Sequence, residues 1–125
     1  MLPKENRLPG YLIPQTLKSG QRFFSSLFTL VVVQSPNKKI QLAIIVPKKI
    51  NKKAVKRNKI KRRFREAIKA SLNLIEPGTR AVFLVKEKAM VAKFAVIKAE
   101  VKKALDQTGL VFNKNKKWLF LKKFF

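Results

Sequence analysis

Residues 42–68, LAIIVPKKINKKAVKRNKIKRRFREAI, contain the change of pattern on which the fold depends. The stretch begins with aliphatic and β-branched residues, which are typical of a strand. From residue 51 or 54 to about residue 74, apolar residues recur at steps of three and four, which predicts an amphipathic helix. The apolar stripe contains Ile60, Phe64, Ala67, Ile68 and Ser71. The opposite side carries Asn58, Lys61, Arg62, Arg65 and Lys69. One side of this helix therefore suits a core and the other suits a polyanion.

Upstream of this helix the sequence predicts a basic arm, a short helix and two strands. Residues 1–12 are irregular and broken by prolines, and Pro14 suits the first turn of a helix over residues 14–20. Residues 23–34, which are interrupted by Ser25-Ser26, and residues 39–46 are rich in β-branched and aromatic residues and flank the turn sequence Ser-Pro-Asn. We therefore predict that they pair as a hairpin. Both runs are apolar at consecutive positions, which indicates that both faces of the sheet are at least partly covered.

Downstream, residues 81–85 are typical of a buried strand and residues 90–107 of a second amphipathic helix. Its inward positions are predicted to be Met90, Phe94, Ile97, Val101, Ala104 and Leu105. The order helix, strands, helix, strand and helix indicates one α+β layered domain over residues 1–112. Residues 113–125 alternate lysines with aromatic residues. This tail could be a packed terminal helix, an RNA-stacking segment or a weak membrane-surface element.

The composition limits both the class of protein and the chemistry that it can perform. A chain of 125 residues suits one domain with one core. It has no cysteine and no histidine, and its six acids stand singly, so disulfides and a protein-borne metal or catalytic site are not expected. Four glycines without a phosphate-binding loop argue against an NTPase. The longest apolar run, residues 27–33, is too short to span a membrane, and no secretory signal is visible, so we expect a soluble cytoplasmic protein without stable membrane association.

Charge is the strongest functional indication. Thirty Lys and Arg against six Asp and Glu give a net charge of +24, and residues 6–65 contain no acid. Residues 48–65 alone hold eleven basic residues in eighteen. Such a surface repels itself unless a polyanion neutralises it. A membrane helix would need a broad apolar face and a DNA-reading helix a short partner helix, so RNA held through backbone contacts suits the pattern best.

The same residues resemble the signature of the bacterial ribonuclease P protein family. In that family a strand runs into a Lys-Lys turn and then a helix with an Arg-Asn-Arg motif, followed by Ile or Val, Lys and Arg. Here the motif stands as Arg57-Asn58-Lys59 and Ile60-Lys61-Arg62. The likeness extends to Asn6-Arg7-Leu8, Gly20, residues 81–86 and the last helix, and covers about residues 4–107. It implies an α/β sandwich with the element order α-β-β-β-α-β-α around a central, mostly antiparallel sheet. It also implies a left-handed β-α-β crossover through the basic helix, although the general rule is right-handed.

The resemblance also implies different roles for the RNA subunit and the protein. The large RNA subunit, with bound Mg²⁺, carries the hydrolysis, and the protein assists removal of the 5′ leader from precursor transfer RNA. No catalytic or metal-binding residue is expected in the protein. The residues expected to bind RNA are Lys48, Lys49, Lys52, Lys53, Arg57, Asn58, Lys59, Lys61, Arg62 and Arg65. Lys59 replaces the family's second Arg, which keeps the charge but loses the planar fork that grips a phosphate.

The family holds the leader in a cleft between the sheet and the first helix, where aromatic residues stack on unpaired bases. The matching positions here are Ile13, Leu17 and Val31, and aliphatic groups stack less well. Phe23, Phe24 and Phe28 could compensate, against the alternative that phenylalanines in strands are core residues. Of these we place Phe28 in the predicted cleft, together with Ile13, Leu17 and Val31.

Two other classes compete with this interpretation. A ribosomal or general RNA-binding protein would carry the same charge, but it would bind precursor transfer RNA no more tightly than random RNA. A protein-only nuclease would need clustered carboxylates or histidines, and it would cleave RNA without an RNA subunit.

Overall fold

The computed structural model describes residues 6–34, 39–70, 75 and 78–107. In chain order the elements are η2 (Gly10–Leu12), α1 (Ile13–Ser19), β1 (Gln21–Phe24), β2 (Phe28–Gln34), β3 (Gln41–Ile45), α2 (Ala54–Lys69), β4 (Thr79–Val85), η4 (Glu87–Val91) and α3 (Phe94–Gln107). The succession of helix, three strands, helix, strand and helix is confirmed. The tail predicted at 113–125, and with it the domain boundary at residue 112, lies outside the described residues and stays a prediction.

The four strands form one sheet in the order β1-β2-β4-β3. β2 pairs antiparallel with both β1 and β4, whereas β3 pairs parallel with β4. The sheet is therefore mostly antiparallel, and α2 connects its two parallel strands across one face, as the family resemblance implies. The hand of this crossover stays a prediction.

The predicted hairpin between residues 23–34 and 39–46 is wrong, because β4 lies between β2 and β3. Three consecutive residues of β4, Ala81, Val82 and Phe83, are 0% exposed. A strand that is apolar on both faces loses most water contact at the centre of a sheet, and β4 takes that position although it is the last strand in the chain.

A hairpin does form, but it joins β1 to β2 at the serine pair. The backbone N–H of Ser25 donates to the carbonyl of Phe28 at 2.9 Å, and its Oγ accepts from the N–H of Leu27 at 3.2 Å. Serine hydroxyls stabilise tight turns in this way, by bonding to nearby backbone. The serine interruption in the sequence is thus the chain reversal itself.

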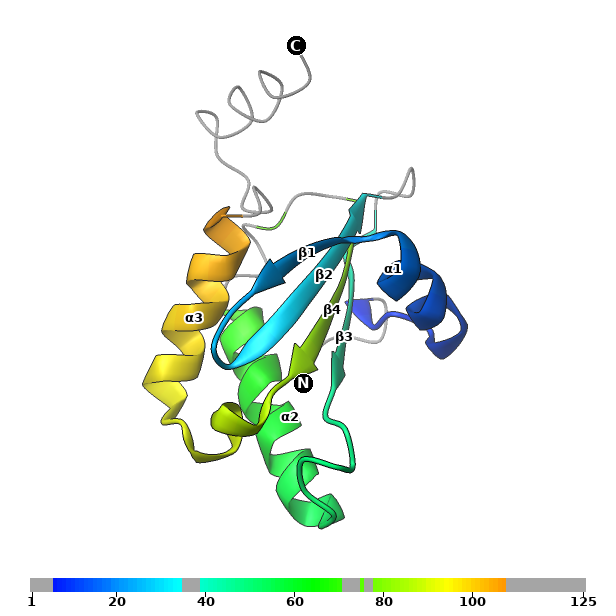
Figure 1. Cartoon of the computed structure of the whole chain (residues 1–125). Coiled ribbons are helices and arrows are strands. Elements are labelled where there is room, and N and C mark those ends of the chain that lie inside the picture. The colour runs from blue at the N-terminus through cyan, green and yellow to red at the C-terminus, as the bar shows by residue number, and fades with distance from the viewer. Residues whose placement is uncertain (1–5, 35–38, 71–74, 76–77, 108–125) are drawn as a thin grey trace.

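Each face of the sheet has its own cover. Figure 1 shows α2 and α3 on one side of the sheet and α1 on the other. Because strand residues alternate between faces, Phe28 and Leu30 of β2 belong to the main core under α2 and α3. Val31 and Val82 point to the other side and are 0% exposed beneath α1. The prediction that both faces are covered is confirmed.

Three phenylalanines form the centre of the main core. The ring of Phe64 on α2 meets Phe28 edge-on with centroids 5.7 Å apart, and Phe83 lies 5.3 Å from Phe28 and 6.3 Å from Phe64. All three side chains are 0% exposed. Each such aromatic pair contributes about 0.5–1.5 kcal/mol beyond the burial of its area, so this cluster ties α2 firmly to the sheet.

The second amphipathic helix is shorter than predicted. The chain is extended at Ala92, which separates η4 from α3 and resets the helical phase. Phe94 is consequently 41% exposed, and its predicted inward position is wrong. The prediction holds for Ile97, Val101, Ala104 and Leu105, which are all 0% exposed.

The outer edge of β3 is partly covered by residues of the N-terminal arm. The N–H of Leu8 donates to the carbonyl of Leu42 at 2.9 Å, and Nδ2 of Asn6 donates to the carbonyl of Ile40 at 2.9 Å. These bonds use backbone carbonyls that an open edge would leave unpaired. Across the described parts of the chain, no helix is long and apolar enough to cross a membrane.

Candidate nucleic-acid interface

The basic helix α2 is held at its start by the turn that precedes it. The N–H of Ile50 donates to the carbonyl of Pro47 at 3.0 Å, which closes this turn. Asn51 then makes two bonds: its Oδ1 accepts from the N–H of Lys53 at 2.9 Å, and its carbonyl accepts from the guanidinium of Arg57, also at 2.9 Å. The turn over residues 47–50, which we call the lysine turn, and the first turn of α2 therefore form one connected unit.

The inner side of α2 agrees with the predicted stripe. Ile60 is 2% exposed, Ala67 is 1% exposed, and Phe64 and Ile68 are 0% exposed. Ser71, the last predicted member, lies outside the described residues. With the stripe packed on the sheet, the remaining side chains of α2 face away from the core.

Every residue predicted to bind RNA has its side chain exposed or half-buried. The exposed ones are Lys48, Lys49, Lys52, Lys53, Asn58, Lys59 and Arg62, and the half-buried ones are Arg57, Lys61 and Arg65. At 100° per residue, four of them fall on one flank of the apolar stripe, and Arg57 lies beside that flank at the N-terminal end of the stripe itself. We call the flank together with Arg57 the motif face; it consists of Arg57, Asn58, Lys61, Arg62 and Arg65.

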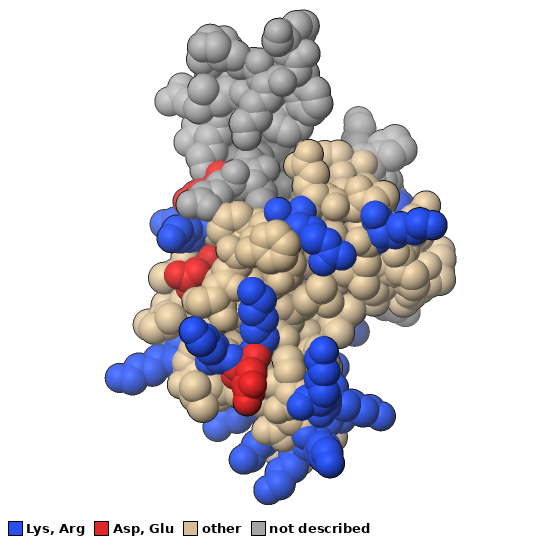
Figure 2. All heavy atoms as spheres, in the orientation of Figure 1, with Lys and Arg blue, Asp and Glu red and all other residues tan. Residues whose placement is uncertain are grey.

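Lys59 does not belong to the motif face. The helical turn places it on the other flank of the stripe, where it lines a hollow with Lys56 and Arg63. The helix therefore presents cations on both sides of its buried stripe. Figure 2 shows Lys and Arg side chains gathered at the lower end of the molecule, where α2 and the turn before it lie in Figure 1.

The motif face combines four cations with one amide on a rigid element. Arginine presents a planar set of donors that matches phosphate oxygens, lysine a compact charge, and asparagine both a donor and an acceptor. These groups suit phosphates and ribose hydroxyls rather than a reaction that needs a general base. The arrangement can hold a polyanion and neutralise part of its charge.

The predicted leader cleft needs two corrections. Phe28 is 0% exposed on the α2 and α3 side of the sheet, so it cannot contact a leader on the α1 side. Val31 does face α1 but is also 0% exposed, because α1 lies directly on it. A Cβ atom on Gly20 would lie 2.5 Å from Cγ1 of Val31, so the chain at the end of α1 approaches this far only without a side chain there. Ile13 and Leu17 are half-buried on α1 and keep accessible surface.

Phe24 is the exposed aromatic residue on this face of the sheet. It pairs with Thr29 across the β1–β2 hairpin and therefore points to the same side as Val31. The ring is 68% exposed, and Nζ of Lys86 lies 5.9 Å from its centroid. Lys86 also donates to the carbonyl of Ser25 at 2.7 Å. The alternation of β1, in which Phe23 packs on the core, is the signal that separates Phe24 from its neighbour.

A protein-borne metal site finds little support. Among the residues that the structure describes, no three His, Cys, Asp or Glu side chains come together in a way that could hold a metal ion. The described part of the chain therefore offers no carboxylate cluster of the kind that holds Mg²⁺ in proteins.

Comparisons with known proteins agree with the geometry. A family model described as Ribonuclease P matches residues 2–109. A protein of Picosynechococcus sp. named Ribonuclease P protein component is 35% identical over 107 residues, 85% of this chain and 92% of that protein. A protein of the same name from Rickettsia bellii is 36% identical over 96 residues, 70% of this chain and 80% of that protein. A solved structure of the Staphylococcus aureus RNase P protein superposes with a TM-score of 0.76 at 25% identity, over 88% of this chain and 100% of that one.

Proposed function

Because the chain belongs to the ribonuclease P protein family, we propose that it works as the RNA-binding subunit of ribonuclease P, the ribonucleoprotein that matures the 5′ end of transfer RNA. The observation that carries the proposal is the motif face of α2. It holds Arg57 and Asn58 of the motif, with Lys61, Arg62 and Arg65, exposed or half-buried at the surface, while the stripe behind it is fixed in the core. Its partner is the ribonuclease P RNA.

The protein contributes position and charge. The motif face and the lysine turn neutralise phosphates of the RNA subunit and lower the repulsion between that RNA and the precursor. The bond from Arg57 to the carbonyl of Asn51 keeps turn and helix together, so that both contact the RNA as one surface. Hydrolysis is assigned to the RNA subunit and its bound Mg²⁺, as the family resemblance implies. Under this proposal the protein acts in the cytoplasm.

The 5′ leader of the precursor is assigned to the α1 side of the sheet. Ile13 and Leu17 on α1 supply aliphatic contact, and Phe24 supplies an exposed ring for an unpaired base. Lys86, beside that ring, supplies a charge for the adjoining phosphate. This set replaces the predicted one, in which Phe28 and Val31 took these parts.

The direct test is reconstitution. The purified protein is added to a ribonuclease P RNA at a Mg²⁺ concentration too low for the RNA alone, and cleavage at the 5′ end of a precursor transfer RNA is followed. We expect the protein to restore processing, and a variant with Arg57→Ala and Arg62→Ala to restore much less at the same concentration. Cleavage by the protein without RNA would support the nuclease alternative instead. Equal affinity for precursor and random RNA, with no gain in processing, would support a general RNA-binding protein.

A further inference from the structure

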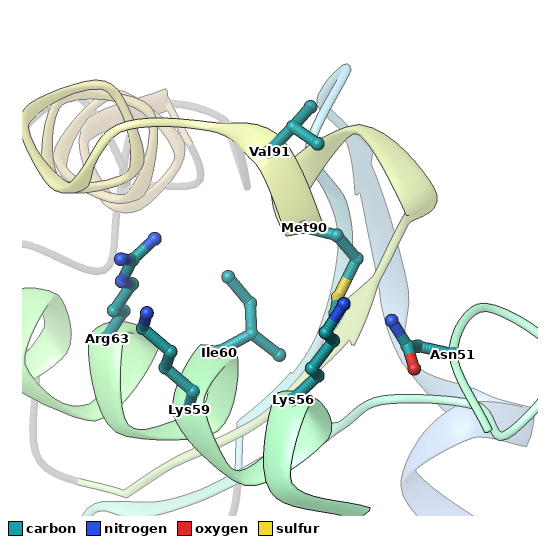
Figure 3. A pocket seen from close by; sticks show the side chains of 7 residues that line it. All are labelled: Asn51, Lys56, Lys59, Ile60, Arg63, Met90 and Val91. Atoms are coloured by element: carbon teal, nitrogen blue, oxygen red, sulfur yellow. The ribbon is translucent and has the colours of Figure 1, made fainter. Parts of the chain in front are cut away.

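A hollow of about 280 Å³ lies between α2 and η4, on the flank of α2 opposite the motif face. Figure 3 shows the side chains that surround it, which come from the turn before α2, from α2 and from η4. The lining residues are Asn51, Lys56, Lys59, Ile60, Arg63, Met90 and Val91. Its volume lies just below the range of roughly 300–1,000 Å³ that is typical of small-molecule sites. The space therefore suits one small group with a flat or compact shape.

Three cations stand around this space. Lys56, Lys59 and Arg63 line it, and Figure 3 shows Lys59 and Arg63 side by side. Arg63 makes a long bond of 3.4 Å from NH1 to the carbonyl of Ala92, which holds its guanidinium beside η4 and leaves its other N–H groups for an anion. None of the described residues that line the hollow is acidic. The rim is therefore suited to a phosphate.

The rest of the lining is apolar and differs from a plain phosphate site. Ile60 is 2% exposed, Met90 is half-buried, and Val91 is 88% exposed. A thioether beside a ring makes favourable contact with aromatic systems, and aliphatic groups pack on a ring face. A nucleic-acid base is the planar ring that always accompanies a phosphate in RNA.

Asn51 adds a polar group at the edge of the space. Its Oδ1 is engaged by the N–H of Lys53 at 2.9 Å, which fixes the orientation of the amide. Figure 3 shows the amide nitrogen of Asn51 on the side of the hollow. That nitrogen can donate a hydrogen bond to an acceptor on the edge of a base.

We propose that the hollow holds one unpaired nucleotide of RNA, with its phosphate between Lys59 and Arg63 and its base against Met90 and Val91. The inference rests on the proposed function, because the nucleotide belongs to the RNA that α2 binds. A base inside a double helix is stacked and cannot offer its face, so the nucleotide comes from a loop, bulge or single strand. α2 thus contacts RNA on two flanks: the motif face holds backbone, and the hollow selects an unstacked base.

Two substitutions with the same change in charge test the apolar wall. Val91→Asp puts a carboxylate where the base and phosphate would lie, and Val96→Asp puts one on an exposed position of α3 that does not line the hollow. We expect Val91→Asp to weaken binding of ribonuclease P RNA by about 10-fold, in the range of one lost base contact. Val96→Asp should weaken it by no more than about 2-fold, because exposed charges at a distance are screened. Equal losses in the two variants would overturn the proposal.

Cross-linking identifies the contacted nucleotide independently of affinity. The chain has no cysteine, so Val91→Cys and Val96→Cys each create a single thiol for a photoreactive group. We expect the group at residue 91 to cross-link to one or a few unpaired nucleotides, and the group at residue 96 to give a weaker and different pattern. Cross-links from residue 91 only to base-paired segments would contradict the proposal.

The experiments distinguish a failure of the proposed function from a failure of the nucleotide assignment at the hollow. If the unmodified protein neither binds ribonuclease P RNA nor restores processing, the proposed function fails. If the unmodified protein does both, but residues 91 and 96 behave alike in both experiments, only the assignment of the hollow fails.

Discussion

Arg57 shows how a single side chain can serve the fold and the interface together. Its NH1 donates to the carbonyl of Asn51, and its half-buried guanidinium stays at the border of the motif face. The side chain of Arg62, four positions beyond Asn58, is exposed, so we expect it to contribute to RNA binding and not to the fold. The two arginines of the motif therefore differ in what their removal costs.

Arg62→Ala is expected to weaken binding of ribonuclease P RNA while leaving the fold intact. An exposed residue away from special features changes stability by about 0.5 kcal/mol or less. Loss of one phosphate contact should lower the slope of log affinity against log salt by about 1. Titrations at several salt concentrations, together with a denaturant curve, measure both quantities. A collapse of the fold in Arg62→Ala, with unchanged RNA binding of the folded fraction, would count against the role of the motif face.

Arg57→Ala should weaken RNA binding in the same way and should also lower the free energy of unfolding by about 0.5–1.5 kcal/mol, because the bond from Arg57 to the turn is lost. The same titrations and denaturant curve measure both effects.

Phe24→Ala tests the leader assignment at the level of one ring. Because Phe24 is 68% exposed, its removal should leave the melting temperature nearly unchanged. Affinity for a precursor with a leader should fall by about 1–3 kcal/mol, the range for one stacked base, while affinity for mature transfer RNA stays constant. Equilibrium binding of the holoenzyme to the two RNAs measures the difference. Phe94→Ala is the matched control, because this ring is 41% exposed on α3, on the opposite side of the sheet (Figure 1). An equal loss for both RNAs would rule out a leader contact.

At the scale of elements, the approach of α1 to the sheet depends on a missing side chain. Gly20 ends α1 with an ordinary negative φ of −79°, so its backbone does not require glycine. The surrounding atoms do require glycine at this position. A Cβ added to Gly20 would lie 2.8 Å from the carbonyl oxygen of Thr16, in addition to its clash with Val31. The tight contact between Gly20 and Val31 excludes solvent from Val31 and Val82 and fixes the distance between α1 and the strands.

Gly20→Ala should therefore push α1 away from β2. We expect a loss of about 1–3 kcal/mol in the free energy of unfolding, as for other overpacked sites. Gly10→Ala is the control, because nothing lies within 4 Å of a Cβ at that position. Urea unfolding of the two variants gives the comparison. Equal midpoints would show that α1 can shift without cost.

At the scale of the whole molecule, the net charge of +24 makes stability and binding depend on the same anions. Lysines and arginines spread over the faces of the domain repel one another in the free protein. Under the proposed function, phosphates that bind the motif face would remove part of that repulsion. The folded state should consequently gain stability whenever its RNA is present.

The link between RNA binding and the stability of the protein can be tested by varying the salt concentration. With about five or six phosphates neutralised by the motif face and its turn, affinity for ribonuclease P RNA should fall on the order of 10³-fold between 50 and 200 mM salt. With free RNA at 100 times the dissociation constant, the free energy of unfolding should rise by about 2.7 kcal/mol. Binding titrations and melting curves, each at both salt concentrations, measure the two effects. An affinity that does not change with salt would exclude phosphate contacts as the main source of binding.

Local sequence is enough to predict the order of the elements, the buried stripe of α2 and the exposure of the motif residues. These properties depend on local periodicity, because a residue's neighbours three and four positions away decide which side it shares. The serine pair likewise marks the chain reversal between β1 and β2, although in the sequence it is visible only as an interruption of the strand pattern.

Which strands are neighbours, and which aromatic ring is accessible, depends on long-range packing that the local pattern does not contain. Two strands with equally apolar runs give no local sign of which one lies at the centre, and β4 took that place because its burial on both faces removes the most apolar surface from water. The same choice put Phe28 into the core and left Phe24 outside. The hollow beside Lys59 was equally invisible in the sequence, since Met90 and Val91 reach α2 only through the packing of η4. Neighbours along the chain fix a helix or a strand, whereas contacts across the sheet are fixed by how much surface the complete fold can bury.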